Sequence, residues 1–369
     1  MVSLFKTPDA EEKLRILAAD SQYDLACACG TKNEKNGSRK RTADGESWIY
    51  PTTMADGRRT FLFKTLISNV CNSDCAYCPL RAEKDPRRMS LSPEETAKIF
   101  MDYLRQNRVQ GIFISSGITG NADFAMERIL QTARILRFKE KFHGYMHLKI
   151  LPGTSDEAIY EAVSLASAVS LNIEAPGEKH FLKLSKYKDY LTQIINPLKK
   201  IAKITEHNSR GRFVCSSTQF VVGAAGEQDR DIINYSEGLY KRLGFGRVYF
   251  SAYQNTDSGA NLTREHRLYQ SDFLIRKYGF SASEIPLTDS GNLNLDYDPK
   301  EYWAILHPDF FPLNINRAGK NELLRIPGFG PMLVNRILKI RQNSTIRTLD
   351  FVGQKAYLAK KAGAFVRFS

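Results

Sequence analysis

The sequence predicts an α/β fold built around a mainly parallel β-sheet. From Thr60 onward, apolar runs of strand length alternate with segments of helical periodicity, and short polar turns separate them. Six strands that alternate with helices are expected to pair in parallel through right-handed crossovers. A length of 369 residues suits an α/β barrel of roughly 200 to 250 residues with smaller appendages. The pattern alone leaves open both a doubly wound sheet and a partial barrel.

One helix and one basic loop are expected before the alternating part. Residues 9–26 have helical spacing, with Asp9 as the N-cap. Residues 30–47 are rich in Gly, Asn, Lys and Arg and contain almost nothing apolar, which is typical of an exposed loop. This loop is either a solvated linker or a contact for nucleic acid.

Each element of the alternating part has its own pattern. The expected strands are residues 61–68, 111–116, 145–151, 168–174, 217–224 and 247–253. The expected helices are residues 92–107, 123–138, 156–165, 190–203 and 229–243, followed by an amphipathic helix at 264–278. The first of these helices opens with Ser, Pro and two Glu residues, a combination that caps a helix N-terminus.

Composition and charge exclude several classes of protein. Hydrophobic residues make up 42% and charged residues 25% of the chain, which is ordinary for a globular protein and not for a disordered or fibrous one. No apolar run has the ~18 residues that cross a bilayer, and acidic residues interrupt the opening segment, so we expect a cytoplasmic protein. The net charge of +13 favours a polyanionic partner. Residues 301–369 contain eleven Lys and Arg against four Asp and Glu, so the tail is especially cationic.

Three of the six cysteines lie within eight residues, directly after the first strand of the series. Cys71, Cys75 and Cys78 have the spacing C-x3-C-x2-C. Thiolates are soft ligands for iron, and three in one loop can ligate three irons of a cubane and leave the fourth open. A structural zinc site would need a fourth ligand from elsewhere in the chain. The remaining cysteines, expected to be buried or incidental thiols rather than a second cluster, are Cys27, Cys29 and Cys215.

The pattern C-x3-C-x-aromatic-C after a first strand resembles the radical S-adenosylmethionine (SAM) superfamily. The resemblance implies a partial (β/α)6 TIM-like barrel, a [4Fe-4S] cluster held by the three cysteines, and SAM bound to the open iron. Reductive cleavage of SAM then yields a 5'-deoxyadenosyl radical that abstracts a hydrogen atom from the substrate. Tyr77 occupies the aromatic position, which in this superfamily lies near the adenine.

The same resemblance implies further SAM-binding residues. Ser115, Ser116 and Gly117 follow the second strand, where the superfamily commonly has a Gly-Gly-Glu turn that receives the methionine amino group. The two hydroxyls depart from that form but can accept hydrogen bonds from an ammonium group. Asn172 and Glu174 alternate on the expected fourth strand and resemble the pair that binds the ribose hydroxyls.

The fifth strand ends in VVGAAGE, which is similar to the glycine-containing adenine contact of the superfamily. Val222 and Gly223 are the matching positions, although Glu227 sits one place late. His147 and Lys149 on the third strand are expected to face the cavity, because polar side chains on a strand buried on both faces need a partner. The last strand contributes two more residues expected at the same mouth, Ser251 and Tyr253.

The tail contains LNINRAGKNELLRIPGFGP followed by MLVNRILKIRQ, a predicted helix, tight turn and helix. This pattern resembles the helix-hairpin-helix motif, in which backbone N–H groups at the start of the second helix approach a DNA phosphate. The residues expected to contact DNA are Pro327, Gly328, Phe329, Gly330, Arg336 and Lys339. A plain helical hairpin, whose glycines only turn the chain, is the alternative.

Nearly the whole chain resembles a bacterial group of radical SAM proteins assigned to DNA modification or repair. Stretches such as SQYDLACACG, GYMHLKILPG and HPDFFPLNINRA carry this resemblance. It implies a helical N-terminal extension at 1–59, a radical SAM partial barrel at 60–300 and a helix-hairpin-helix domain at 301–369. It also implies three partners: DNA, a protein resembling uracil-DNA glycosylase, and an electron donor such as flavodoxin or ferredoxin.

Two other functions stay open at this point. A radical SAM enzyme that modifies RNA or tRNA would also use a basic surface. A non-catalytic DNA-binding iron-sulfur protein would keep the cluster for structure or redox sensing. Cleavage of SAM by the reduced protein separates the enzymes from the sensor.

Overall fold

The computed structural model describes residues 8–23, 46–53, 59–206, 213–253, 258–350 and 361–369. Cys27, Cys29 and most of the expected basic loop lie outside these residues. The chain divides into two compact units, an N-terminal unit of residues 1–227 and 238–262 and a C-terminal unit of residues 228–237 and 263–369. The domain boundaries expected after residues 59 and 300 stay predictions.

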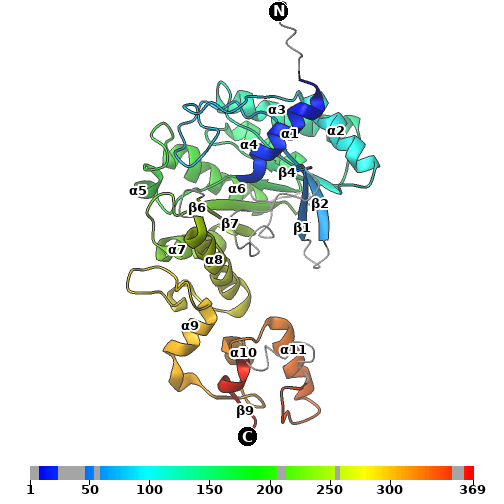
Figure 1. Ribbon diagram of the computed structural model, residues 1–369. Helices are drawn as coiled ribbons and strands as arrows, with labels where there is room; N and C mark the ends of the chain where they lie inside the picture. Colours follow the sequence, from blue (N-terminus) through cyan, green and yellow to red (C-terminus); the bar gives the residue numbers. More distant parts are fainter. Residues whose placement is uncertain (1–7, 24–45, 54–58, 207–212, 254–257, 351–360) are drawn as a thin grey trace, which may run out of the picture. The chain divides into compact units, whose positions relative to one another are not determined.

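Seven strands form one sheet in the order in which they occur in the chain (Figure 1). They are β1 (Ile49–Thr53), β2 (Arg59–Leu66), β3 (Gly111–Ser115), β4 (Tyr145–Lys149), β5 (Ala168–Ser170), β6 (Cys215–Val222) and β7 (Arg247–Ala252). β2 to β7 pair in parallel, and β1 pairs antiparallel with β2. Because the order never reverses, the sheet is singly wound, as in a barrel. Since β1 and β7 do not pair with each other, the barrel is partial, and the doubly wound alternative is excluded.

The six parallel strands are the six that the sequence predicts, and a helix follows each of the first five. The helices are α1 (Ala10–Asp20), α2 (Pro93–Arg105), α3 (Ala122–Arg134), α4 (Asp156–Leu165), α5 (Glu178–Phe181), α6 (Asn196–Glu206), α7 (Asp229–Leu243) and α8 (Ser258–Tyr278). Two π-helical turns, Ile135–Lys139 and Leu191–Ile195, extend α3 and precede α6. α2, α3, α4 and α6 pack against one another in sequence along the sheet, as right-handed crossovers require (Figure 1).

Local capping explains where α2 begins. The hydroxyl of Ser92 accepts a hydrogen bond from Glu95 N at 3.0 Å, and the Glu95 carboxylate accepts one from Ser92 N at 2.7 Å. Lys13 of α1 also donates to Glu95, at 2.8 Å. The expected Ser-Pro-Glu-Glu cap is therefore confirmed, and it fastens α1 to the start of α2.

Two predictions about the sheet need correction. β5 ends at Ser170 rather than at residue 174, because Ile173 N donates to the side chain of Thr218, and Glu174 adopts a left-handed backbone with φ 64°. The strand β1 was not predicted, and it contains Pro51. β1 is an edge strand, where a missing N–H is tolerated.

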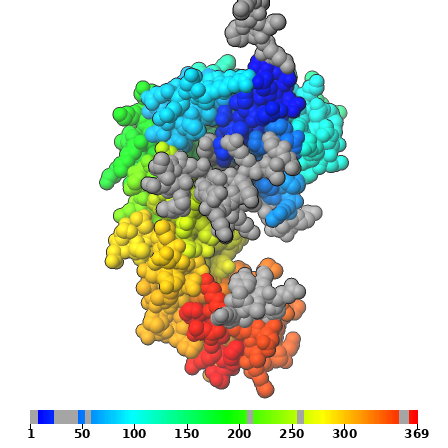
Figure 2. Space-filling view, in the orientation of Figure 1, coloured from blue at the N-terminus to red at the C-terminus, as the bar shows by residue number. Residues whose placement is uncertain are grey.

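The C-terminal unit is a small helical body with its own core. Its elements beyond α8 are α9 (Pro299–Leu306), α10 (Lys320–Arg325), α11 (Pro331–Ile340) and the two-stranded sheet of β8 (Leu313–Asn314) and β9 (Val366–Arg367). Ile315, Leu323, Phe329, Val334 and Ile337 are at most 1% exposed and form the centre of this core. In the space-filling view, these orange to red segments form one continuous body (Figure 2).

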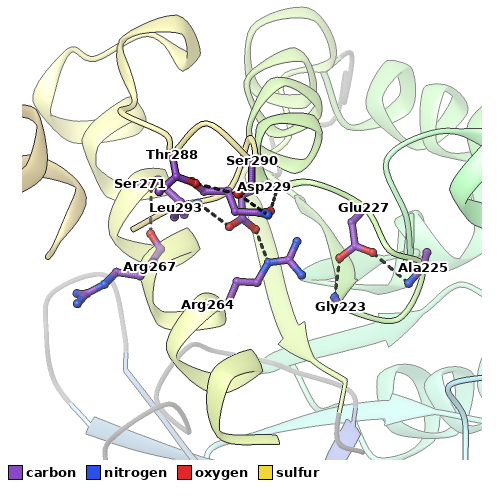
Figure 3. A network of polar contacts seen from close by, with 11 residues as sticks. Gly223, Ala225, Glu227, Asp229, Arg264, Arg267, Ser271, Thr288, Ser290 and Leu293 are labelled. Atoms are coloured by element: carbon purple, nitrogen blue, oxygen red, sulfur yellow. Dashed lines mark hydrogen bonds and ion pairs between the residues drawn. The ribbon is translucent and has the colours of Figure 1, made fainter. Parts of the chain in front are cut away.

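A buried carboxylate joins the segments at the start of this unit. Asp229, the first residue of α7, is 0% exposed. It accepts hydrogen bonds from Arg264 Nε at 2.7 Å and from Leu293 N at 2.9 Å (Figure 3). Both bonds satisfy a charge that would otherwise be costly to bury.

None of the described helices is long and apolar enough to span a bilayer.

Candidate active site

The cysteine loop leaves the C-terminal end of β2 and is fastened to the turn that follows β3. Asn72 N donates to Ile118 O at 2.8 Å, and Gly117 N donates to Ser68 O at 2.7 Å. A side chain at Gly117 would collide with the carbonyl oxygen of Val70, so this turn needs glycine to lie against the loop. The loop therefore has a defined shape set by its own backbone.

The three free thiols of this loop line one cavity of about 450 Å³. Cys75 is 7% exposed, while Cys71 and Cys78 are half-buried. Burial raises the pKa of the Cys75 thiol, and Lys188, whose Nζ lies 3.0 Å from Sγ, opposes that shift. Among the described residues, no three His, Cys, Asp or Glu side chains converge as the ligands of one ion would. In a cubane cluster each thiolate binds a different iron, so the thiols surround the cluster and do not converge on one ion.

The rest of the cavity wall comes from the C-terminal ends of the parallel strands and the segments that follow them. Outside the cysteine loop, its polar and small residues include Ser115, Ser116, Gly117, Lys149, Asn172, Glu174, Lys188, Gln219, Ser251 and Tyr253. This is the edge at which the active sites of parallel barrels lie. The volume of the cavity, about 450 Å³, is within the ~300–1,000 Å³ typical of small-molecule sites.

Most of the residues predicted to bind SAM meet at this cavity, although several come from irregular segments. Tyr77 and the Ser115, Ser116 and Gly117 turn line it, as do Asn172 and Glu174. The last two were expected on a strand, but they lie beyond the end of β5. Their side chains reach the cavity from an irregular segment, and the strand alternation that predicted them does not apply.

Glu174 and Tyr77 are bonded to each other across the cavity wall. The Tyr77 hydroxyl donates to the Glu174 carboxylate at 2.6 Å. Burial and the nearby carboxylate raise the pKa of Tyr77 well above its ordinary value, so the phenol stays protonated and remains a donor. This bond links the cysteine loop to the segment after β5.

Lys149 and His147 were both expected at the cavity, and only Lys149 is there. Lys149 Nζ donates to Asn172 Oδ1 at 2.5 Å, inside the wall. His147 packs edge-on against Phe113, with 4.5 Å between ring centroids, and its Nε2 lies 2.8 Å from Ser170 Oγ. The prediction for His147 is wrong, since it belongs to the packing of the sheet.

Val222 and Gly223 do not line the cavity, although their neighbour Val221 does. Gly223 has a φ of 87° and begins a tight turn. The Glu227 carboxylate closes that turn by accepting hydrogen bonds from Gly223 N at 2.5 Å and Ala225 N at 3.0 Å (Figure 3). The extra residue before Glu227 is thus accommodated within the turn itself.

Sequence reasoning missed several charged and polar residues of the wall. These are Asp20, Arg81, Lys84, Lys188 and Gln219. Arg81 and Lys84 follow the cysteines and could have been inferred from that proximity. Lys188 is far from them in sequence and lies in an irregular segment, so no periodicity pointed to it.

Cys215 is separate from this site. It is the first residue of β6 and so lies at the N-terminal end of that strand, whereas the cavity lies at the C-terminal ends of the strands. Burial raises the pKa of its thiol. It behaves as a packed thiol and does not join the three cysteines of the loop.

In the C-terminal unit, α10 and α11 flank the Pro-Gly-Phe-Gly segment. Gly328 has a φ of 85°, which favours glycine, and Phe329 is buried in the core of the unit. Gly330 is the N-cap of α11. Arg336 and Lys339 are exposed and lie three residues apart, so they share one face of α11.

A buried lysine braces this turn. Lys300 of α9 donates to Leu324 O at 3.2 Å and also to Phe329 O. Its ammonium group lies 4.7 Å from the centre of the Tyr278 ring. Burial lowers the pKa of Lys300 to about 7.

Comparison with known protein families finds one match, which covers less than half of the chain. Residues 65–237 match the family model described as Radical SAM superfamily. No curated protein matches the chain.

Solved structures that match part of the chain include methylornithine synthase, at 14% identity over 58% of this chain and 62% of that one, with a TM-score of 0.46. HydG, a maturase of the [FeFe]-hydrogenase, is 11% identical over 81% of this chain and 79% of its own, with a TM-score of 0.46. SuiB of Streptococcus suis, crystallised with SAM, is 13% identical over 74% of this chain and 54% of its own, with a TM-score of 0.43. The chain thus spans less than two thirds of methylornithine synthase. Residues 65–237 are therefore similar to the radical SAM superfamily, whose cofactors are a [4Fe-4S] cluster and SAM.

Proposed function

We propose that this chain is a radical SAM enzyme that abstracts a hydrogen atom from DNA in a modification or repair reaction. The observation that carries the proposal is the meeting of three free thiols and the expected SAM-binding residues at one cavity. The hairpin and exposed basic residues of the C-terminal unit support DNA as the substrate. The expected cytoplasmic location belongs to the same proposal.

We assign Cys71, Cys75 and Cys78 as the cluster ligands. The donor set fits, because three soft thiols from one loop face a common space and a cation lies against the most buried of them. When bound and reduced, the cluster supplies the electron that cleaves SAM into methionine and a 5'-deoxyadenosyl radical.

The cavity wall offers groups that bind and orient SAM. Ser115 and Ser116 provide hydroxyl oxygens for the methionine ammonium group. Glu174 and Asn172 provide acceptors for the ribose hydroxyls, and the ring of Tyr77 provides an apolar face for the adenine. The cofactor roles of Val222 and Gly223 are not retained, because neither residue lines the cavity.

The C-terminal hairpin would bind the DNA backbone without regard to sequence. Gly328 and Gly330 allow the backbone N–H groups at the start of α11 to approach a phosphate closely. Arg336 and Lys339 add charge on the exposed face of the same helix. Pro327 and Phe329 give the turn its shape, since Phe329 anchors it in the core.

Anaerobic turnover with deuterated duplex DNA tests the whole proposal. Reduced protein with SAM should release 5'-deoxyadenosine that carries deuterium, detected by mass spectrometry. The Cys75→Ala protein is the control and should release none. Deuterium recovered only from labelled RNA would support the RNA-modifying alternative instead. A protein that holds a cluster but never cleaves SAM would be the non-catalytic iron-sulfur protein.

The proposal includes two protein partners. A flavodoxin or ferredoxin would supply electrons to the cluster, and a protein resembling uracil-DNA glycosylase would act on the same DNA. Pull-down from extracts with the purified chain tests both, and a DNase-treated extract is the control for bridging by DNA.

A further inference from the structure

Lys188 is a cation in direct contact with a thiol of the cysteine loop, and the proposed contacts with SAM and DNA do not include it. Its Nζ donates to Cys75 Sγ at 3.0 Å. Cys75 is also the most buried of the three thiols. A charge–sulfur contact in such a poorly solvated place acts strongly, because little water screens it.

The placement of Lys188 is built by hydrogen bonds that start on both sides of Cys75. On one side, the Asp74 carboxylate accepts from Lys186 N at 2.7 Å and from Tyr187 N at 3.3 Å. It accepts from the Ser185 hydroxyl as well.

On the other side of the thiol, Ala76 N donates to Leu184 O at 2.7 Å. Lys188 N then donates to the Ser185 hydroxyl at 3.2 Å, which completes the turn. The two residues that flank Cys75 in sequence therefore both hold the segment that carries Lys188. An incidental surface lysine would have no such scaffold.

We propose that Lys188 tunes the cluster electrostatically by raising its reduction potential, and that Asp74 is a positioning residue for Lys188. This inference rests on the proposed function, since it takes Cys75 as a cluster ligand. Reduction adds one electron and one negative charge to the cluster, with no bond formed or broken, and the electron comes from a low-potential one-electron donor. An ammonium group bonded to a ligand sulfur stabilises the more negative state. Lys188 thereby eases the reduction that precedes SAM cleavage.

Redox titration of the reconstituted cluster, followed by electron paramagnetic resonance, tests this proposal. Lys188→Met should hold as much iron and sulfide as the unaltered protein but have a more negative midpoint potential. We expect the ratio of reduced to oxidised cluster at a fixed potential to fall about tenfold, which is about 59 mV for a one-electron couple. Lys188→Arg should keep most of the original potential. Lys186→Met is the matched control, because Lys186 lies exposed in the same turn and should leave the potential unchanged.

The outcomes separate this inference from the proposed function. A Lys188→Met protein with a full cluster and an unchanged potential would overturn the role of Lys188 alone. Absence of any cluster in the unaltered protein would overturn the proposed function. If Lys188→Met does not hold a cluster, Asp74→Asn decides. The single amide oxygen of Asn cannot accept from the Ser185 hydroxyl, Lys186 N and Tyr187 N together. The segment that holds Lys188 should therefore loosen, and the midpoint potential should become more negative by a smaller amount than in Lys188→Met. An unchanged potential in Asp74→Asn would then count against the proposal.

Discussion

Buried polar side chains in the cavity wall are paired with one another, which keeps the wall ordered. Tyr77 is bonded to Glu174, and Lys149 is bonded to Asn172. Each pair replaces the water that its groups would otherwise need. These pairs also place acceptors around the space assigned to SAM.

Glu174→Gln should weaken SAM binding while leaving the cluster in place. The amide keeps one acceptor oxygen but loses the charge that strengthens its bonds to hydroxyl groups, so we expect about a tenfold loss of affinity. Anaerobic calorimetry measures the affinity, and iron analysis measures the cluster. Glu178→Gln, an exposed neighbour in α5, is the control. Equal SAM affinities for the two variants would remove Glu174 from the cofactor site.

Lys300 should make the stability of the C-terminal unit depend on pH. Burial depresses its native pKa to about 7, below that of an unfolded lysine, while Asp298 raises it and Lys361 lowers it further. Between those two pKa values the unfolded chain binds more protons, so the free energy of unfolding rises with pH, by at most about 1.4 kcal/mol per pH unit. Below pH 7 both states are protonated and this contribution is absent.

Urea unfolding from pH 7 to 9 checks this expectation. Trp303 in α9 reports on the C-terminal unit when Trp48, the other tryptophan, is replaced by Phe. Lys300→Met should flatten the pH profile, because it removes the titrating group. Parallel profiles for the two proteins would show that another group causes the slope.

Elements of the N-terminal unit are joined by close backbone contacts as well as by side chains. The turn after β3 lies directly against the cysteine loop, with Gly117 at the point of contact. α2 starts at a capping box that also receives Lys13 of α1. The position of the cysteine loop therefore depends on Gly117, and the position of α1 against α2 depends on the contact of Lys13 with Glu95.

Gly117→Ala should lower the amount of cluster that the protein holds. The added methyl group would press on Val70 O and push the cysteine loop away, at a cost of about 1–3 kcal/mol. Iron and sulfide per chain after reconstitution measure the effect. Ser116→Ala, one residue earlier, adds no atoms and should keep the full iron content. If both variants load equally, the turn does not hold the loop.

Gly328→Ala should weaken binding to duplex DNA. Its φ of 85° costs a non-glycine residue about 1–2 kcal/mol, so the hairpin should shift or loosen. Fluorescence anisotropy with labelled duplex measures the affinity. Gly319→Ala is the control, because Gly319 precedes α10 with an ordinary φ of −69°. Undiminished binding by Gly328→Ala would argue that the glycine serves only to turn the chain.

The cationic tail, residues 301–369, lies within the C-terminal unit. Residues 301–369 carry eleven Lys and Arg against four Asp and Glu, which is 7 of the 13 net positive charges, and they belong entirely to that unit. The segment that matches the radical SAM family model lies mostly in the other unit. Binding of a polyanion and chemistry on SAM should therefore respond to different substitutions.

Arg336→Ala with Lys339→Ala should reduce the salt dependence of DNA binding. Each side chain lost removes one phosphate contact, so the slope of log affinity against log salt should shrink by about two. The loss should be the same for unrelated duplex sequences. Iron content is the control and should not change. An unaltered slope would place the DNA elsewhere.

The sequence predicted the order of the parallel strands and helices because each has a clear apolar period and flanking turns. The three cysteines were equally clear, since their ligand spacing is local. Glu174 was expected within a continuous strand, but β5 ends at Ser170, and Glu174 is held beside β6 by a single bridge to Phe220. Lys188 was missed because its contact with Cys75 depends on folding, not on spacing. The edge strand β1 was not predicted; its Pro51 lacks an N–H group, which an edge position tolerates.

The cysteine loop is held by hydrogen bonds to segments outside it. Asn72 and Ala76 donate their backbone N–H groups to carbonyl oxygens outside the loop, and the Asp74 carboxylate accepts a hydrogen bond from Lys186 N. Hydrogen bonds of this kind reduce the conformational entropy that a loop loses when it binds a metal cluster. Exposure to air that strips the metal should accordingly leave an intact, empty receptacle. Inactivation of this kind would be reversible, and a supply of iron and sulfide would restore the protein without synthesis of a new chain.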